Sequence, residues 1–155
     1  MVMDSLHKRD VALDILMPLI RQELSEGKSV RFTPKGISML PMLRHGKDTV
    51  TISPAPERLK KHDLPLYQRD DGKYILHRVI RAKETYTCMG DNQFNREVSV
   101  RHDQIIGLVT EFTRGERSIS VQAWHYRLYC RIWAATRLPR YCWKKGISLL
   151  RRLVK

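Results

Sequence analysis

The first part of the chain has apolar residues at the spacing of an amphipathic helix. Between residues 4 and 26 they recur three and four positions apart, which places them on one helical face. They are Val11, Ile15, Leu16, Leu19, Ile20 and Leu24. Gly27 is a typical helix stop, and Pro18 interrupts the run. We predict an N-terminal segment, residues 1–28, with either one kinked helix or two short ones.

From residue 29 to 121 the pattern changes to short runs rich in Val, Ile, Thr and Tyr, separated by Gly, Pro and Asp. Such runs are typical of antiparallel strands joined by turns. The predicted strands are residues 29–33, 49–53, 64–69, 73–81, 84–89, 105–114 and 117–121. The pattern therefore predicts a mainly β domain, a compact antiparallel barrel or sandwich, with a helical segment on either side.

After Gln122, apolar and basic residues are interleaved at helical spacing, with a break predicted at Pro139. Residues 122–155 contain nine Lys or Arg and no acid, so they account for most of the formal net charge of +13. This basic amphipathic tail has three interpretations. It packs on the domain, lies on an anionic membrane surface, or binds nucleic acid. Nucleic acid is the least favoured, because no reader motif accompanies the tail.

Composition narrows the class of protein. A chain of 155 residues with 42% apolar residues can bury the core of one domain. The cysteines, Cys88, Cys130 and Cys142, cannot all pair and lack the close spacing of a zinc site. Asp14 and Pro18 interrupt the first apolar stretch, and no run approaches the roughly 18 apolar residues of a membrane span. We expect reduced thiols, no metal or other cofactor, and a cytoplasmic location, at most peripheral to the membrane.

Three short motifs contain the residue types that acyl transfer needs. The sequence GISMLP at residues 36–41 places Ser38 between a glycine and a proline, which suits a tight turn with a reachable hydroxyl and nearby backbone N–H groups. His77, in the predicted strand 73–81, offers a base with an ordinary pKa of about 6.5. The sequence GDN at residues 90–92 offers Asp91 to orient an imidazole. Each motif also has an ordinary turn or strand interpretation, so the prediction depends on their joint occurrence.

In this order the motifs resemble those of the superfamily that joins type I signal peptidases with the self-cleaving LexA and UmuD proteases. The resemblance covers about residues 30–121 and implies the compact β fold of the LexA C-terminal domain. It implies that Ser38 is the nucleophile, that His77, directly before Arg-Val, is the general base, and that Asp91 is the assisting acid. It also implies a substrate-binding loop, with Gly36, Ile37, Met39 and Pro41 as substrate-binding residues.

The histidine at the base position resembles the endoplasmic-reticulum type of signal peptidase. Lys73 is a poor substitute base, because four residues of strand place it about 13 Å away. Gly36 occupies a position where relatives often have a hydroxyl residue, so oxyanion stabilisation is expected from the Ser38 N–H. Glu97 could correspond to a second acid of that type. We expect no counterpart of the relatives' N-terminal membrane anchor, because the first apolar stretch is interrupted by Asp14 and Pro18.

These inferences predict a cytoplasmic serine endopeptidase that processes a protein or leader peptide bound in extended form. The alternative is a LexA-like regulator that cleaves itself or no longer cleaves, or an adaptor on such a fold. The absence of an Ala-Gly pair, the bond cleaved in LexA, counts against self-cleavage. The remaining histidines, His7, His45, His62, His102 and His125, are expected on the solvated surface, with no metal site.

Overall fold

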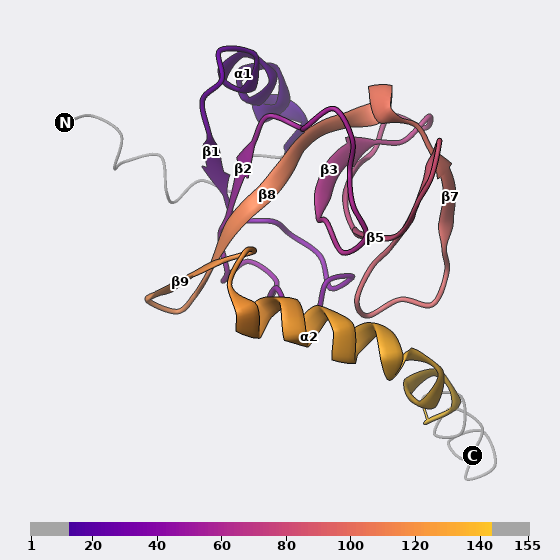
Figure 1. The fold of residues 1–155 in the computed structure, drawn as a ribbon. Coiled ribbons are helices and arrows are strands. Elements are labelled where there is room, and N and C mark those ends of the chain that lie inside the picture. Colours follow the sequence, from indigo (N-terminus) through magenta and orange to yellow (C-terminus); the bar gives the residue numbers. More distant parts are fainter. Residues whose placement is uncertain (1–12, 144–155) are drawn as a thin grey trace, which may run out of the picture.

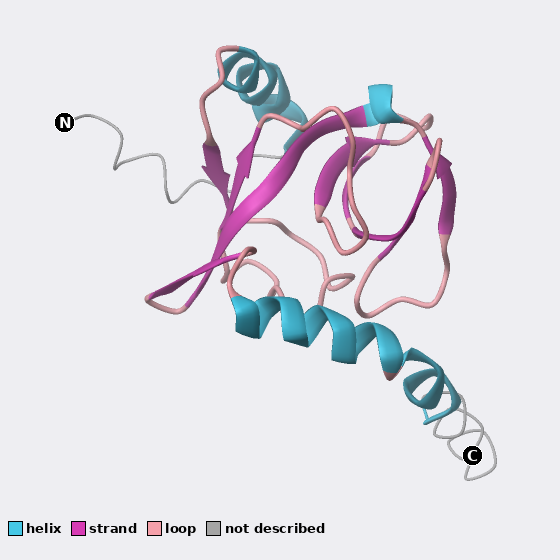
Figure 2. Cartoon of the chain, in the orientation of Figure 1, coloured by secondary structure: helices cyan, strands magenta, loops and turns pink. Residues whose placement is uncertain are grey.

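The computed structural model describes residues 13–143, which form two antiparallel sheets with a helix at each end (Figure 1). This confirms the mainly β class with flanking helices. The strands lie between the two helices in the chain and in space (Figure 2). Within the described part, neither sheet closes on itself, so a closed barrel is not formed.

The larger sheet is organised around one long strand. Strand β8 (Ile105–Arg114) pairs antiparallel with β2 (Val50–Ser53), β3 (Pro65–Gln68) and β9 (Arg117–Ser120). Strands β1 (Val30–Phe32) and β4 (Tyr74–Leu76) lie at its edges. The smaller sheet has the order β5 (Arg78–Ala82), β6 (Tyr86–Met89) and β7 (Glu97–Val100). The predicted strands 49–53 and 105–114 agree with β2 and β8.

Two predictions about strands were wrong. Residues 73–81, predicted as one strand, form β4 and β5, which belong to different sheets and are separated at His77. Strand β7 was not predicted, because its residues have no apolar run, and only Val100 is buried. Both differences affect the candidate site.

The N-terminal helix α1 (Leu13–Ser25) contains Pro18 without ending there. The part of the predicted helix before residue 13 lies outside the described residues. The predicted apolar face is only partly correct: Ile20 and Leu24 are buried, whereas Ile15 and Leu19 are exposed. Met17, at 1% exposure, takes a place in the core instead. The helix thus packs through a face that is rotated from the predicted one.

The C-terminal helix α2 (Trp124–Ala135) buries Tyr126 and Cys130 in the same core as α1 and the larger sheet. The break predicted at Pro139 is wrong, because the helix is interrupted at Thr136 and is helical again over 137–143. Pro139 then falls in a first helical turn, where the missing N–H needs no partner. None of the described helices is both long and apolar enough to cross a membrane.

Candidate functional site

His77 lies where the chain leaves the larger sheet and enters the smaller one. It belongs to neither β4 nor β5, and its side chain is buried, with 3% of the residue exposed. Leu76, before it, packs against one core cluster, and Val79, after it, is buried in the other. The imidazole is therefore fixed between the two sheets.

Ser38 lies in the loop that follows β1. Gly36 begins the turn with φ +114°, a conformation that favours glycine, and its N–H donates to His45 Nδ1 at 2.7 Å. The loop is attached to the GDN motif, because the Asn92 N–H donates to the Ser38 carbonyl at 2.8 Å. The Asn92 side chain donates to the Ile37 carbonyl at 3.1 Å. The first and third motifs are thus in direct contact.

Gly90 is the point where all three motifs meet. A β-carbon at this position would lie 2.6 Å from the Ser38 carbonyl oxygen and 3.1 Å from His77 Nε2. Any larger residue would displace the serine loop or the imidazole. Glycine is therefore required here by the close approach of the Ser38 carbonyl and His77 Nε2.

The Ser38 side chain is half-buried, and within residues 13–143 no hydrogen bond joins its hydroxyl to His77. In enzymes, hydrogen bonds between catalytic groups are often long without substrate and tighten when substrate binds. The Ser38 N–H is also without a partner in the described part of the chain, so it can donate to an oxyanion.

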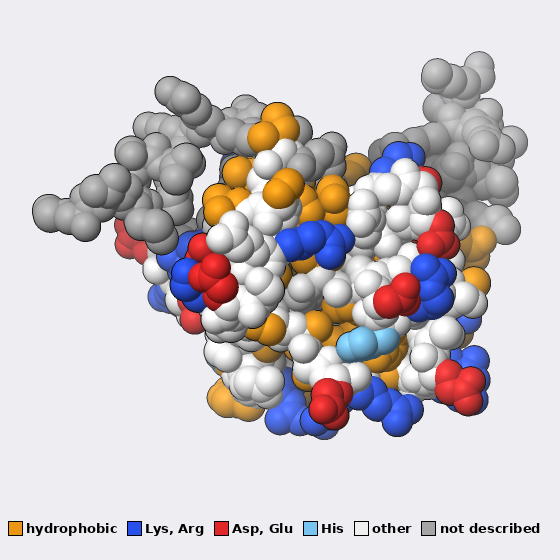
Figure 3. Space-filling model, turned by 90° about the horizontal axis from the view of Figure 1, so that it is seen from above, with side chains coloured by type: hydrophobic (Ala, Val, Ile, Leu, Met, Phe, Trp, Pro, Cys, Tyr) orange, Lys and Arg blue, Asp and Glu red, His pale blue; other side chains and the backbone are white. Residues whose placement is uncertain are grey.

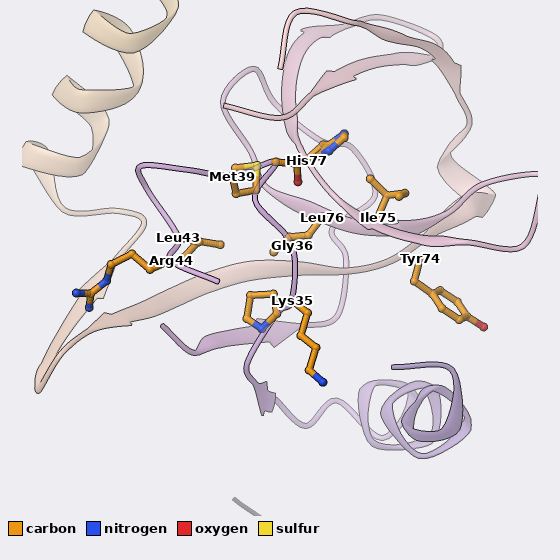
Figure 4. A pocket seen from close by; sticks show the side chains of 11 residues that line it. Lys35, Gly36, Met39, Leu43, Arg44, Tyr74, Ile75, Leu76 and His77 are labelled. Atoms are coloured by element: carbon orange, nitrogen blue, oxygen red, sulfur yellow. The ribbon is translucent and has the colours of Figure 1, made fainter. Parts of the chain in front are cut away.

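Ser38 and His77 line a common cavity of about 100 Å³ (Figure 4). Of the expected substrate-binding residues, Gly36 and Met39 line it, but Ile37 and Pro41 do not, and Ile37 is 63% exposed. The rest of the lining was not predicted as substrate-binding: Pro34, Lys35, Leu43, Arg44, Tyr74, Ile75 and Leu76. Residues 74–76 were missed because only the pairing of β4 with β3 places them beside the serine loop.

The carboxylate next to His77 is that of Glu97. Glu97 Oε1 lies 2.9 Å from His77 Nδ1, a short contact that is not aligned as a straight hydrogen bond. Arg69 donates to Glu97 Oε2 from Nε at 2.8 Å and contacts Oε1 through Nη2. The Tyr67 hydroxyl donates to Oε2 at 2.7 Å. Glu97 is therefore positioned by Tyr67 of β3 and by Arg69, which follows that strand.

This environment favours a neutral imidazole beside an ionised carboxylate. Burial lowers the pKa of His77 below its ordinary value, and the Glu97 charge offsets this only in part. Burial raises the pKa of Glu97, but hydrogen bonds from Arg69 and Tyr67 outweigh it, so the pKa lies below the ordinary value. At neutral pH His77 can thus accept a proton, and Glu97 can stabilise the resulting imidazolium.

The expected contact between Asp91 and His77 is corrected by the structure. Asp91 forms a buried two-point ion pair with Arg78, with Nε to Oδ1 at 2.8 Å and Nη2 to Oδ2 at 2.7 Å. Among the described residues, no ion pair joins Asp91 to His77. Arg78 directly follows His77, and successive side chains of an extended chain point to opposite sides. The two carboxylates are therefore on different sides of this segment.

Other expectations are resolved more simply. His62, expected on the solvated surface, is half-buried, and its Nδ1 has no partner in the described structure. Lys73 is exposed and pairs with Asp71 at 3.2 Å. The three cysteines are free thiols. Residues 13–143 contain no group of three His, Cys, Asp or Glu side chains that could bind a metal ion.

No protein-family model matches the chain, and no curated protein sequence matches it either.

Proposed function

We propose that this protein is a serine endopeptidase in which Ser38 is the nucleophile, His77 the general base and Glu97 the acid that orients it. The observation that carries the proposal is the convergence at Gly90, where the Ser38 backbone and His77 Nε2 approach one point. The Glu97 carboxylate at His77 Nδ1 supports the assignment. A fold of the signal peptidase and LexA type is part of this proposal.

In the first step, Ser38 Oγ attacks the substrate carbonyl while its proton passes to His77 Nε2. The oxyanion accepts a hydrogen bond from the Ser38 N–H, and the Glu97 charge stabilises the imidazolium. His77 then gives the proton to the leaving amine, which departs as the acyl-enzyme forms. Water then attacks the ester as His77 takes its proton, and His77 gives this proton to Ser38 Oγ as the acid product leaves.

The substrate is proposed to be a protein or leader peptide in extended form. The cavity of about 100 Å³ has room for one small side chain rather than a folded segment. Met39, Leu43 and Leu76 give it apolar walls, so a small apolar side chain next to the cleaved bond is favoured. Free thiols in the described chain suit a reducing compartment, and we propose a cytoplasmic location.

A proteome-derived peptide library tests this proposal without knowledge of the natural substrate. New termini found by mass spectrometry should appear with the unchanged protein and be absent with Ser38→Ala. Ser29→Ala, which removes an exposed hydroxyl outside the cavity, serves as the matched control and should leave the products unchanged. Identical products from Ser38→Ala and the unchanged protein would contradict the proposal.

The same experiment tests the alternative of a self-cleaving regulator. In that case the intact mass of the unchanged protein decreases on incubation, whereas the mass of Ser38→Ala stays constant. An inactive adaptor predicts no difference between the two proteins in either measurement.

A further inference from the structure

The outer side of α2 carries an exposed apolar stripe. Trp124, Leu128 and Ile132 are spaced four residues apart, so they lie along one side of the helix, and they are 77%, 46% and 54% exposed. Beyond Thr136, Leu138, Tyr141 and Trp143 are also exposed. A folded protein rarely leaves a large apolar surface contiguous and uncovered unless that surface binds something.

This stripe is not needed to attach the helix to the domain. The opposite side of α2 already buries Tyr126 and Cys130 in the core. Trp133 Nε1 donates to the Asp91 carbonyl at 3.0 Å, and the Arg140 guanidinium lies 3.4 Å from the Trp133 ring centre and also donates to that carbonyl. Figure 1 shows α2 along one end of the β body, with its far side turned away from the strands.

The charge beside the stripe is of one sign. Arg127 and Arg131 are exposed on α2, and no acidic residue follows Glu116 in the sequence. The end of the molecule remote from α2 is different, because there basic and acidic side chains lie next to one another (Figure 3). The described part of the C-terminal surface therefore combines exposed apolar groups with basic groups and has no acidic residue on its helix.

We infer that the outer face of α2, with residues 137–143, docks on an anionic lipid bilayer. A basic amphipathic helix buries its apolar side in the headgroup region, while its basic residues gain from the anionic lipids. A second copy of the chain is a poorer occupant, because face-to-face packing would bring Arg127 and Arg131 of both copies together without acids on this helix. Nucleic acid would use the arginines but leave Trp124, Leu128 and Ile132 without a role.

Co-sedimentation of the full chain with vesicles tests the inference. Binding to phosphatidylcholine vesicles containing one quarter phosphatidylglycerol should be at least ten-fold stronger than binding to phosphatidylcholine alone, and should weaken in high salt. The triple variant Trp124→Ser, Leu128→Ser, Ile132→Ser should lose this binding. Arg127→Glu with Arg131→Glu should weaken the preference for anionic vesicles.

A matched control is available on the other helix. Ile15→Ser with Leu19→Ser removes exposed apolar side chains of α1 and should bind vesicles as the unchanged protein does. Circular dichroism confirms that each variant is folded. Vesicle binding that survives the triple substitution would overturn the inference. So would a dimer by light scattering, or retention on duplex DNA, in a protein that shows no preference for anionic vesicles.

Discussion

Asp91 and Glu97 lie six residues apart, each is paired with an arginine, and only one of them contacts the imidazole. Asp91 is almost fully buried, and Arg78 occupies both of its oxygens. The Glu97 side chain retains 18% exposure, and its Oε1 also contacts His77 Nδ1. The comparison indicates that Asp91 has a structural role in attaching the GDN loop, whereas Glu97 is placed to act on the base.

The largest expected effect is on turnover. Glu97→Gln should lower the rate roughly 10⁴-fold, as loss of the orienting acid does in a serine protease triad. The reason is that the amide cannot stabilise the imidazolium. Rates on a peptide identified from the library measure this, with circular dichroism as the check of folding. Glu111→Gln removes another arginine-paired carboxylate and should leave the rate unchanged. A larger loss of turnover in folded Asp91→Asn would reverse the assignment.

Asp91→Asn should act mainly on stability. Removal of one partner of a buried ion pair leaves Arg78 uncompensated, and the free energy of unfolding should fall by about 3–5 kcal/mol. Urea denaturation measures this change. Asp71→Asn breaks the exposed pair with Lys73 and should cost less than about 1 kcal/mol. A cost below about 1 kcal/mol for Asp91→Asn as well would contradict the expected penalty of leaving Arg78 unpaired.

Gly90→Ala tests the close approach of the serine loop and the His77 imidazole at Gly90. The added β-carbon must displace the Ser38 carbonyl or the imidazole, and a misplacement of about 1 Å costs roughly 100-fold in rate. Gly107→Ala is the control, since its β-carbon would press on the Ser53 carbonyl, outside the cavity. We expect that variant to lose stability but keep its specific activity. Full activity in Gly90→Ala would contradict the close approach at this position.

The smallest effect is on the titration of His77. Because burial lowers the pKa of His77, kcat/KM should rise with pH along a limb centred below 6.5, as the ring becomes neutral. The Glu97 charge raises this pKa, so NMR titration in Ser38→Ala, Glu97→Gln should show a still lower pKa for His77. The double variant Ser38→Ala, Asp91→Asn should lower the pKa of His77 less, since the Asp91 charge has the weaker influence on it. A limb near pH 9 or 10 would indicate a lysine base instead.

The lowered pKa of His77 also makes the free energy of unfolding depend on pH. Between the lowered pKa of His77 in the folded protein and the value of about 6.5 in the unfolded chain, the unfolded state binds more protons. The free energy of unfolding should therefore decrease as the pH falls through this window, and His77 should contribute no pH dependence above it.

Local pattern was sufficient for much of the fold. The strand predicted from the run at 105–114 agrees with β8, and the apolar and basic mixture after 122 agrees with a helix. It was insufficient for β7, a four-residue edge strand in which Glu and Ser alternate with Val, and for the break at His77, where the apolar run continues from one sheet into the other. The contact of Glu97 with His77 was not predicted for the same reason: β7 brings Glu97 opposite Cys88 on β6, and that register is not visible in a run of residues.

By itself, the sequence determined the candidate chemistry. It contains a serine in a turn with a nearby glycine, a histidine next to an arginine, and an aspartate directly after a glycine. It also determined the mainly β class, because side-chain periodicity is a local property of the chain. Only the tertiary structure decided which acid contacts His77, which side chains line the cavity and which side of α2 is left exposed. These depend on sheet register and helix rotation, which are set by contacts between residues far apart in the sequence.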